Sequence, residues 1–156
     1  LGLDLDQMLI DVCQFSGLRH RCQRIELHDG RTWVNDSKAT NVNATWYALE
    51  YYEKPIIWIA GGQDKGNDYS ILMDIVKSKV KAIVCLGENN VPIHDAFGNI
   101  VDIIVDTNNT LDAVRKAYEL ASKDDVVLLS PSCASFDLFE NYEDRGNQFK
   151  IAVKEL

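Results

Sequence analysis

The sequence contains no complete nucleotide-binding motif, and it has only three histidines among its 156 residues. The glycine-containing run at 61–66 lacks the GxxxxGKS or GxxxxGKT spacing of a phosphate-binding loop, and no GxGxxG dinucleotide fingerprint occurs. The histidines, His20, His28 and His94, are far apart and lack the spacing of metal ligands, so we expect no metal site in this chain. No serine lies in a GxSxG elbow, which argues against a serine nucleophile.

Cysteine pairs, long apolar runs and positive charge are also scarce. Cys13, Cys22, Cys85 and Cys133 show no CxxC spacing and lie mostly in or beside apolar segments, so we expect thiols in a reducing cytoplasm rather than a disulfide framework. No apolar run is long enough to span a bilayer and no signal peptide is evident, so we expect no membrane partner. Because 16 scattered basic residues face 24 acidic ones, with a net charge of -8, we expect no nucleic-acid partner.

The first 17 residues have the pattern of a connecting helix that ends in a hinge. Apolar residues recur at three- and four-residue spacing between Leu5 and Phe15, and Gly17 supplies a stop. The chain begins with leucine rather than methionine, so we expect a piece of a longer protein in which residues 1–17 follow a preceding domain. With 46% hydrophobic and 26% charged residues, the chain has enough apolar content for one domain, which we place at 18–156.

Short apolar runs alternate with amphipathic segments along this domain. Asp29-Gly30 between two β-type stretches predicts a hairpin over 18–35, with Arg21 and Asp36 as neighbours at its open end. Further strands are expected at 55–60, 82–86, 103–105 and 126–129, and helices at 44–52, 70–78, 91–97, 111–122 and 146–156. This alternation predicts an α/β fold, a Rossmann-like, doubly wound, mostly parallel sheet with an N-terminal β-hairpin strand and helices on both faces.

Polar turns follow several predicted strands, at the edge where open α/β sheets bind ligands. The first turn runs from Asp36 into a helix that Asn41 or Asn43 would cap, so backbone N–H groups and the helix dipole favour an anion there. Lys38 and Thr40 can add donors, and Asp36 can accept from a hydroxyl or approach a metal. An ordinary polar connection is the alternative interpretation.

Two later turns carry similar groups. Lys65, in the turn at 61–66, is a lone cation suited to one carboxylate. The long stretch at 130–142 contains small residues and serines that can approach a ligand closely, and long loops in compact domains are often functional. We therefore expect both turns to contribute to a ligand site.

Three separated motifs together resemble the C-terminal domain of the Mur ligase family. They are NDSKATN at 35–41, GGQDK at 61–65 and LSPSCASFD at 129–137, with RGN at 145–147 and the pair His20-Arg21 near the start. Most members carry a histidine and a proline in the first turn. This chain has Lys38 and no proline there, and in this it is similar to the members that add D-glutamate. The resemblance extends from about Gly17 to the end of the chain.

The resemblance implies an ATP-dependent, amide-forming ligase of peptidoglycan synthesis, acting as a monomer in the cytoplasm. The carboxylate of UDP-N-acetylmuramoyl-L-alanine would be phosphorylated, and the amine of D-glutamate would attack the acyl phosphate. In this family a central domain brings the phosphate loop and the Mg²⁺ ligands. This chain alone is therefore expected to be inactive and to hold no catalytic residue.

The resemblance also implies roles for individual residues. Those expected to meet ATP are Arg21, Asp36 and Lys38. Those expected to hold D-glutamate, whose carboxylates need fixed donors, are Thr40, Lys65, Ser135, Phe136 and Tyr142. Phe136 and Tyr142 stand where a leucine and a phenylalanine are also expected, which preserves the apolar character of both positions.

Other interpretations stay open. The domain could come from another Mur ligase or from folylpolyglutamate synthetase. A dinucleotide-dependent dehydrogenase would share the fold but needs the missing glycine fingerprint. A non-catalytic Rossmann-like binding module would explain the missing phosphate loop. A Gly-Lys-Ser or Gly-Lys-Thr loop upstream of Leu1 would favour the ligase.

Overall fold

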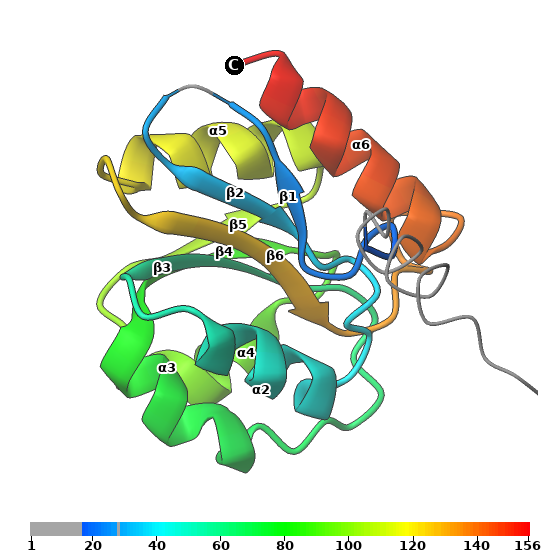
Figure 1. Ribbon diagram of the computed structural model, residues 1–156. Coiled ribbons are helices and arrows are strands. Elements are labelled where there is room, and N and C mark those ends of the chain that lie inside the picture. Colours follow the sequence, from blue (N-terminus) through cyan, green and yellow to red (C-terminus); the bar gives the residue numbers. More distant parts are fainter. Residues whose placement is uncertain (1–16, 28) are drawn as a thin grey trace, which may run out of the picture.

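The computed structural model describes residues 17–27 and 29–156, in which one six-stranded sheet is flanked by helices (Figure 1). The helix predicted before Gly17 lies outside the described residues. The strands are β1 (Gln23–Ile25), β2 (Thr32–Asn35), β3 (Ile56–Gly61), β4 (Val80–Leu86), β5 (Ile104–Thr107) and β6 (Val126–Ser132). Their order across the sheet is β1-β2-β6-β3-β4-β5, with β1 antiparallel to β2 and every other pair parallel.

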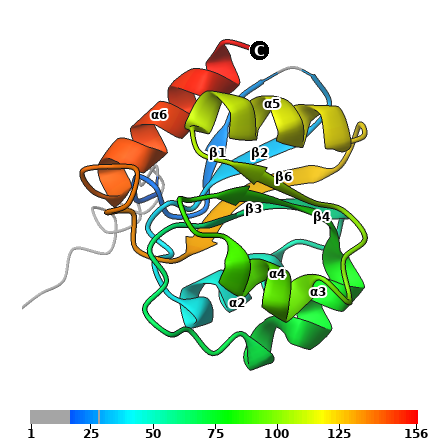
Figure 2. The same cartoon turned by 180° about the vertical axis from the view of Figure 1, so that it is seen from behind.

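Helices cover both faces of the sheet (Figure 2). They are α2 (Val42–Tyr51), α3 (Met73–Lys79) after the 3-10 turn η1 (Ser70–Leu72), α4 (Val91–Phe97), α5 (Thr110–Leu120) and α6 (Tyr142–Lys154). One face carries α2, α3 and α4, and the other carries α5 and α6. The predicted fold class is therefore confirmed. None of the described helices has the length and apolar character needed to cross a membrane.

β3 shows why a strand without polar alternation lies in the middle of this sheet. All six of its residues are buried. Ile56 and Trp58 belong to the core beneath α2, α3 and α4, whereas Ile57 and Ile59 belong to the core beneath α5 and α6. Because successive side chains point to opposite faces, a strand covered on both sides needs apolar residues at every position.

The β1–β2 hairpin brings the start of the described chain to the carboxyl end of β2. Gln23 pairs with Asn35 in antiparallel register. Gly30 occupies the turn with φ of +87°, a left-handed conformation that glycine adopts at the lowest cost. The predicted hairpin is confirmed, and the residues just before β1 lie beside the turn that follows β2.

β6 and α6 are longer than the sequence predicts. β6 ends at Ser132 rather than at position 129, and α6 begins at Tyr142 rather than at position 146. The Asn141 side chain caps α6 by accepting a hydrogen bond from the Asp144 backbone N–H at 2.8 Å. The polar residues that follow Asn141 therefore form the first helical turn, and the connection predicted over 130–142 is shortened to 133–141.

Candidate functional site

Asp36 holds the turn after β2 in place. Its backbone N–H donates to the Leu129 carbonyl oxygen at 2.8 Å. Its carboxylate accepts from the Cys22 backbone N–H at 3.1 Å and from the Ser130 hydroxyl at 2.9 Å. Arg21 precedes Cys22 and lines the same cavity as Asp36, so the two residues are neighbours, as the hairpin predicted.

Burial controls protonation at this corner. Asp36 is 4% exposed, and burial raises the pKa of its carboxyl, while hydrogen bonds from Ser130 and Cys22 and the charge of Arg21 oppose the rise. Burial and the adjacent carboxylate raise the pKa of the Cys22 thiol to about 12. Cys22 is therefore a neutral thiol near pH 7, which does not suit a nucleophile.

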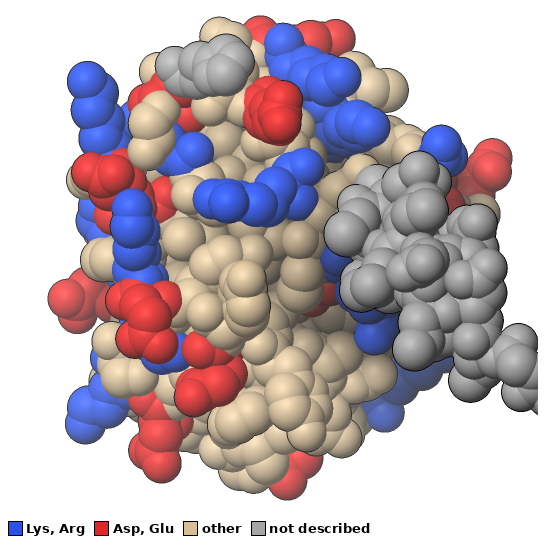
Figure 3. All heavy atoms as spheres, viewed as in Figure 1, with Lys and Arg blue, Asp and Glu red and all other residues tan. Residues whose placement is uncertain are grey.

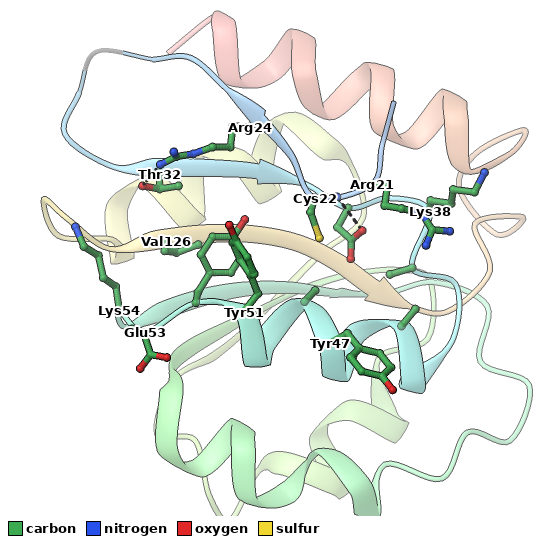
Figure 4. A pocket seen from close by; sticks show the side chains of 15 residues that line it. Arg21, Cys22, Arg24, Thr32, Lys38, Tyr47, Tyr51, Glu53, Lys54 and Val126 are labelled. Carbon is green, nitrogen blue, oxygen red and sulfur yellow. Dashed lines mark hydrogen bonds between the residues drawn. The ribbon is translucent and has the colours of Figure 1, made fainter. Parts of the chain in front are cut away.

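A cavity of about 680 Å³ lies between the β1–β2 hairpin and α2, and we call it the hairpin cavity (Figure 4). Arg21 and Lys38 lie at one end of it (Figure 4). Asp36, which feels the charge of Arg21, lines the same cavity, so the three residues predicted to meet ATP are brought together. Tyr47 and Tyr51 of α2 also line it and are 71% and 75% exposed. The face of the molecule seen in Figure 3 has few charged side chains at its middle, and most charged side chains lie around that area. The cavity therefore combines a cationic end with an apolar wall.

A second cavity, of about 470 Å³, lies among the turns that follow β2, β3 and β6, and we call it the loop cavity. These turns meet because the three strands are parallel and adjacent in the sheet. All five residues predicted to hold D-glutamate line this cavity, namely Thr40, Lys65, Ser135, Phe136 and Tyr142. The structure thus gathers side chains from distant parts of the sequence, from Thr40 to Tyr142.

Lys38 and Tyr142 join the two cavities. The Lys38 ammonium lies 3.2 Å from the Tyr142 hydroxyl oxygen, to which it donates, and 5.1 Å from the centre of the ring. Lys38 lines the hairpin cavity and Tyr142 lines the loop cavity. The two cavities are therefore neighbours.

The turn that carries Lys65 is organised by Asp64. The Asp64 carboxylate accepts from the Asn67 backbone N–H at 3.0 Å and from the Tyr69 hydroxyl at 2.7 Å. Partial burial favours the neutral acid, but these donors and the Gly66 backbone N–H outweigh it and lower the pKa of Asp64. The ionised carboxylate closes the turn and so fixes the backbone from which Lys65 projects.

Arg145 supports the candidate site through contacts that the sequence did not indicate, although RGN at 145–147 formed part of the family resemblance. It is 1% exposed, and burial lowers its pKa to about 10, so it stays charged at neutral pH. Its guanidinium donates to the Ser37 hydroxyl at 3.0 Å, to the Ser37 carbonyl at 2.9 Å and to the Cys133 carbonyl at 3.3 Å. The Ser37 hydroxyl in turn donates to the Tyr142 carbonyl at 2.8 Å. One side chain therefore ties together the turns after β2 and β6.

Lowering the pH is expected to destabilise the fold through His20. This side chain is 4% exposed, and burial lowers its pKa below the ordinary 6.5, against the opposing effect of its hydrogen bond with Asn35. Below pH 6.5 the imidazole of the unfolded chain becomes protonated, whereas that of the folded chain stays neutral until a lower pH. The free energy of unfolding therefore decreases as the pH falls below 6.5. Because a single proton is involved, this slope has an upper limit of about 1.4 kcal/mol per pH unit.

Urea unfolding between pH 7.5 and 5 measures this slope. The variant His20→Gln should show a shallower decline than the wild type. Equal slopes in both proteins would show that His20 does not resist protonation.

The sequence matches a family model described as Mur ligase, glutamate ligase domain, over residues 20–133. UDP-N-acetylmuramoylalanine–D-glutamate ligase from Christiangramia forsetii is 57% identical over 145 residues, covering 93% of this chain and 33% of the relative. The ligase of the same name from Cytophaga hutchinsonii is 45% identical over 156 residues, covering 100% of this chain and 35% of the relative. The chain spans about a third of the length of these relatives.

Solved structures share the fold at low sequence identity. MurF from Acinetobacter baumannii superposes with a TM-score of 0.72 at 14% identity, over 99% of this chain and 35% of that chain. A MurF ligase from Thermotoga maritima in complex with ADP superposes with a TM-score of 0.58 at 13% identity, over 94% of this chain and 34% of that chain. Both likenesses bear on the fold alone.

Proposed function

Since the chain belongs to the Mur ligase family, as its glutamate ligase domain, we propose that it comes from an ATP-dependent ligase joining D-glutamate to UDP-N-acetylmuramoyl-L-alanine. The observation that carries this proposal is the meeting of Thr40, Lys65 and Ser135 in the loop cavity. Other Mur ligases and folylpolyglutamate synthase share the fold, but relatives at 45% and 57% identity are named as D-glutamate ligases, which favours that amino acid.

The loop cavity has the chemistry that D-glutamate requires. The substrate has two carboxylates that need fixed donors and an amine that must reach the acyl group. Lys65 offers an ammonium, and Thr40 and Ser135 offer hydroxyls, each from a different turn. Phe136, which is 65% exposed, adds an apolar wall at the rim. In this proposal the domain binds and orients the amino acid.

The hairpin cavity has the chemistry for part of ATP. Arg21 and Lys38 are two cations at its end, beside the loop cavity, and suit phosphate or ribose oxygens. The Asp36 carboxylate already accepts from Cys22 and Ser130, so its contribution is to position Arg21 and this turn. We therefore assign the Mg²⁺ ligands to the part of the protein outside this chain. When bound, ATP supplies the phosphoryl group that activates the alanine carboxylate.

The remaining assignments follow from the same family. We propose that residues 1–17 connect to a preceding domain and that residues 18–156 form the amino-acid-binding domain. We propose a monomeric enzyme that acts in the cytoplasm in peptidoglycan precursor synthesis. The chain alone is proposed to be inactive, because its sequence contains no phosphate loop.

Replacing Ser135 by alanine in the full-length enzyme tests the proposed function. The Ser135 side chain is 2% exposed and lines the loop cavity, so the change removes one hydroxyl with little effect on packing. A hydrogen bond to a charged group contributes about 1.5–3 kcal/mol, so the KM for D-glutamate is expected to rise by about one to two decades. Steady-state phosphate release with D-glutamate varied at saturating ATP measures this change.

Two controls accompany the measurement. The KM for ATP in the same variant should stay near the wild-type value. Replacing D-glutamate by L-glutamate, L-lysine or meso-diaminopimelate should give little turnover. Equal turnover with another amino acid, or an unchanged KM for D-glutamate, would contradict the assignment. A protein that turns over none of these substrates would favour a non-catalytic binding module.

A further inference from the structure

Cys85, His94 and Asp106 form a side-chain cluster toward the β5 edge of the sheet, away from the hairpin. Cys85 and Asp106 are register partners on the parallel strands β4 and β5, which puts both side chains on one face. The connection between these strands is α4, which crosses the same face and carries His94. One ligand atom from each of the three residues lies within 4.8 Å of the other two.

The cluster has one deep ligand and two near the surface. Cys85 is fully buried, whereas the His94 and Asp106 side chains are 41% and 58% exposed. The His94 Nε2 atom lies 3.0 Å and 3.2 Å from the two Asp106 carboxylate oxygens. An ion pair near the surface accounts for the His94–Asp106 contact. Burial, the Asp106 charge and a hydrogen bond with Asp106 raise the pKa of the Cys85 thiol, so a metal ion would have to displace this proton. His94 and Asp106 also line a cavity of about 540 Å³, which leaves one side of the cluster open to solvent.

We propose that Cys85, His94 and Asp106 bind a divalent transition metal of the zinc class, with water in the fourth position. Thiolate, imidazole and carboxylate together suit zinc, whereas a thiolate disfavours magnesium and calcium. Nitrogen, oxygen and sulfur ligands at about 2.0–2.3 Å from a tetrahedral ion lie roughly 3.3–3.6 Å apart. His94 Nε2 and Asp106 already lie 3.0 Å apart, so binding an ion would mainly shorten the distances to the Cys85 sulfur, which are at most 4.8 Å. The two exposed side chains can supply that movement.

Metal binding changes the protonation of the cluster in a defined way. The Cys85 thiol loses its proton to water as the sulfur–metal bond forms, while His94 binds as neutral imidazole and Asp106 as carboxylate. The ion would then link β4, the edge strand β5 and α4. This site is separate from the hairpin and loop cavities, whose lining includes none of the three residues.

This proposal departs from the expectation drawn from the sequence. The ligands lie at positions 85, 94 and 106, a spacing that matches no metal motif. They meet only because two strands pair in register and the helix that joins them packs on the same face.

Titration of the 156-residue chain with Co²⁺ tests the proposal. Cobalt replaces zinc as a coloured probe, and coordination by a thiolate produces a charge-transfer band in the near ultraviolet. We expect this band in the wild type and its displacement by Zn²⁺. We expect its loss in Cys85→Ser and at least a tenfold weaker Co²⁺ affinity in His94→Asn and Asp106→Asn, since even outer contacts of a metal site change affinity by about 10–100-fold.

The variants Cys22→Ser and Cys133→Ser are matched controls, because both thiols lie outside the cluster and each should leave the band intact. Circular dichroism without metal checks that Cys85→Ser folds. If it does not, the variants of the exposed residues His94 and Asp106 decide the result. The proposal is overturned if the wild type shows no charge-transfer band or if the band survives in folded Cys85→Ser. It is also overturned if the Co²⁺ affinity is unchanged in both His94→Asn and Asp106→Asn, or if Cys22→Ser or Cys133→Ser abolishes the band.

Discussion

Replacing Arg145 by methionine is expected to lower the free energy of unfolding by about 2–4 kcal/mol. The guanidinium donates to the Ser37 carbonyl and hydroxyl and to the Cys133 carbonyl, all inside the protein. Methionine fills a similar volume but leaves these acceptors without a donor, at a cost of roughly 1–3 kcal/mol for each fully buried group. Removing a buried charge recovers part of that cost, so the net loss is smaller than the sum. Urea unfolding followed by circular dichroism measures it.

Arg115→Met provides the matched control for this measurement. Arg115 is exposed on α5, so its replacement is expected to change stability by less than about 0.5 kcal/mol. Arg145→Lys should fall between the wild type and the methionine variant, because lysine keeps the charge but not the planar fork of donors. If Arg145→Met were as stable as Arg115→Met, Arg145 would not hold the two turns together.

Replacing Gly62 by alanine is expected to destabilise the domain and to distort the loop cavity. Gly62 has φ of +127°, where a side chain adds roughly 1–3 kcal/mol of strain. An added Cβ would also overlap the Ala134 carbonyl oxygen. That carbonyl accepts the Gln63 backbone N–H at 2.8 Å, so relief of the overlap would separate the turns after β3 and β6. We expect a loss of about 2–4 kcal/mol, since overpacking alone costs about 1–3 kcal/mol.

Gly66→Ala separates the cost of backbone strain from the cost of the steric overlap with Ala134. Gly66 has φ of +83°, but an added Cβ would meet nothing within 4 Å, so this variant reports backbone strain alone. Its loss of stability is expected to be about 1–2 kcal/mol, clearly less than that of Gly62→Ala. Thermal unfolding of both variants measures the difference. Equal losses would mean that close packing against Ala134 does not constrain this turn.

The fold was predictable because its strands and helices have distinct patterns. The apolar run at 55–60 predicted a strand of a mostly parallel sheet, and β3 is indeed buried at every position. Asp29-Gly30 predicted the hairpin for an equally local reason. The end of β6 was predicted wrongly because polar residues occur both in loops and in buried strands. Ser130 and Ser132 were predicted to lie in a loop, but they continue β6, and their hydroxyls donate to Asp36 and Thr45 inside the protein.

The sequence predicted the turns that form the candidate site but not the buried contacts of Arg145 that hold these turns together. Lys38, Lys65 and Ser135 lie on turns that follow predicted strands, and open α/β sheets bind ligands at that edge, so the sequence suggested that these turns form one region. The order that makes β2, β6 and β3 neighbours came from the structure. Arg145 could not be assigned a role, because it lay just before the helix predicted over 146–156 and an arginine usually faces solvent. Its burial depends on two carbonyl groups and a hydroxyl presented by distant turns, which no local pattern records.

The division of substrates between the two cavities is the central claim, and crossed kinetics on the full-length enzyme test it most directly. Lys65→Ala changes the loop cavity and Arg21→Ala changes the hairpin cavity, whereas Lys77→Ala, exposed on α3, serves as a control. Arg21 is preferred to Lys38 here because Lys38 also contacts Tyr142 of the loop cavity. For each variant, KM is measured with D-glutamate varied at saturating ATP and with ATP varied at saturating D-glutamate.

Lys65→Ala is expected to raise the KM for D-glutamate by about 10–100-fold and to leave the KM for ATP near the wild-type value. Arg21→Ala is expected to show the reverse, and Lys77→Ala should match the wild type. The account is contradicted if Lys65→Ala and Arg21→Ala raise the same Michaelis constant, or if Lys65→Ala leaves D-glutamate use unchanged.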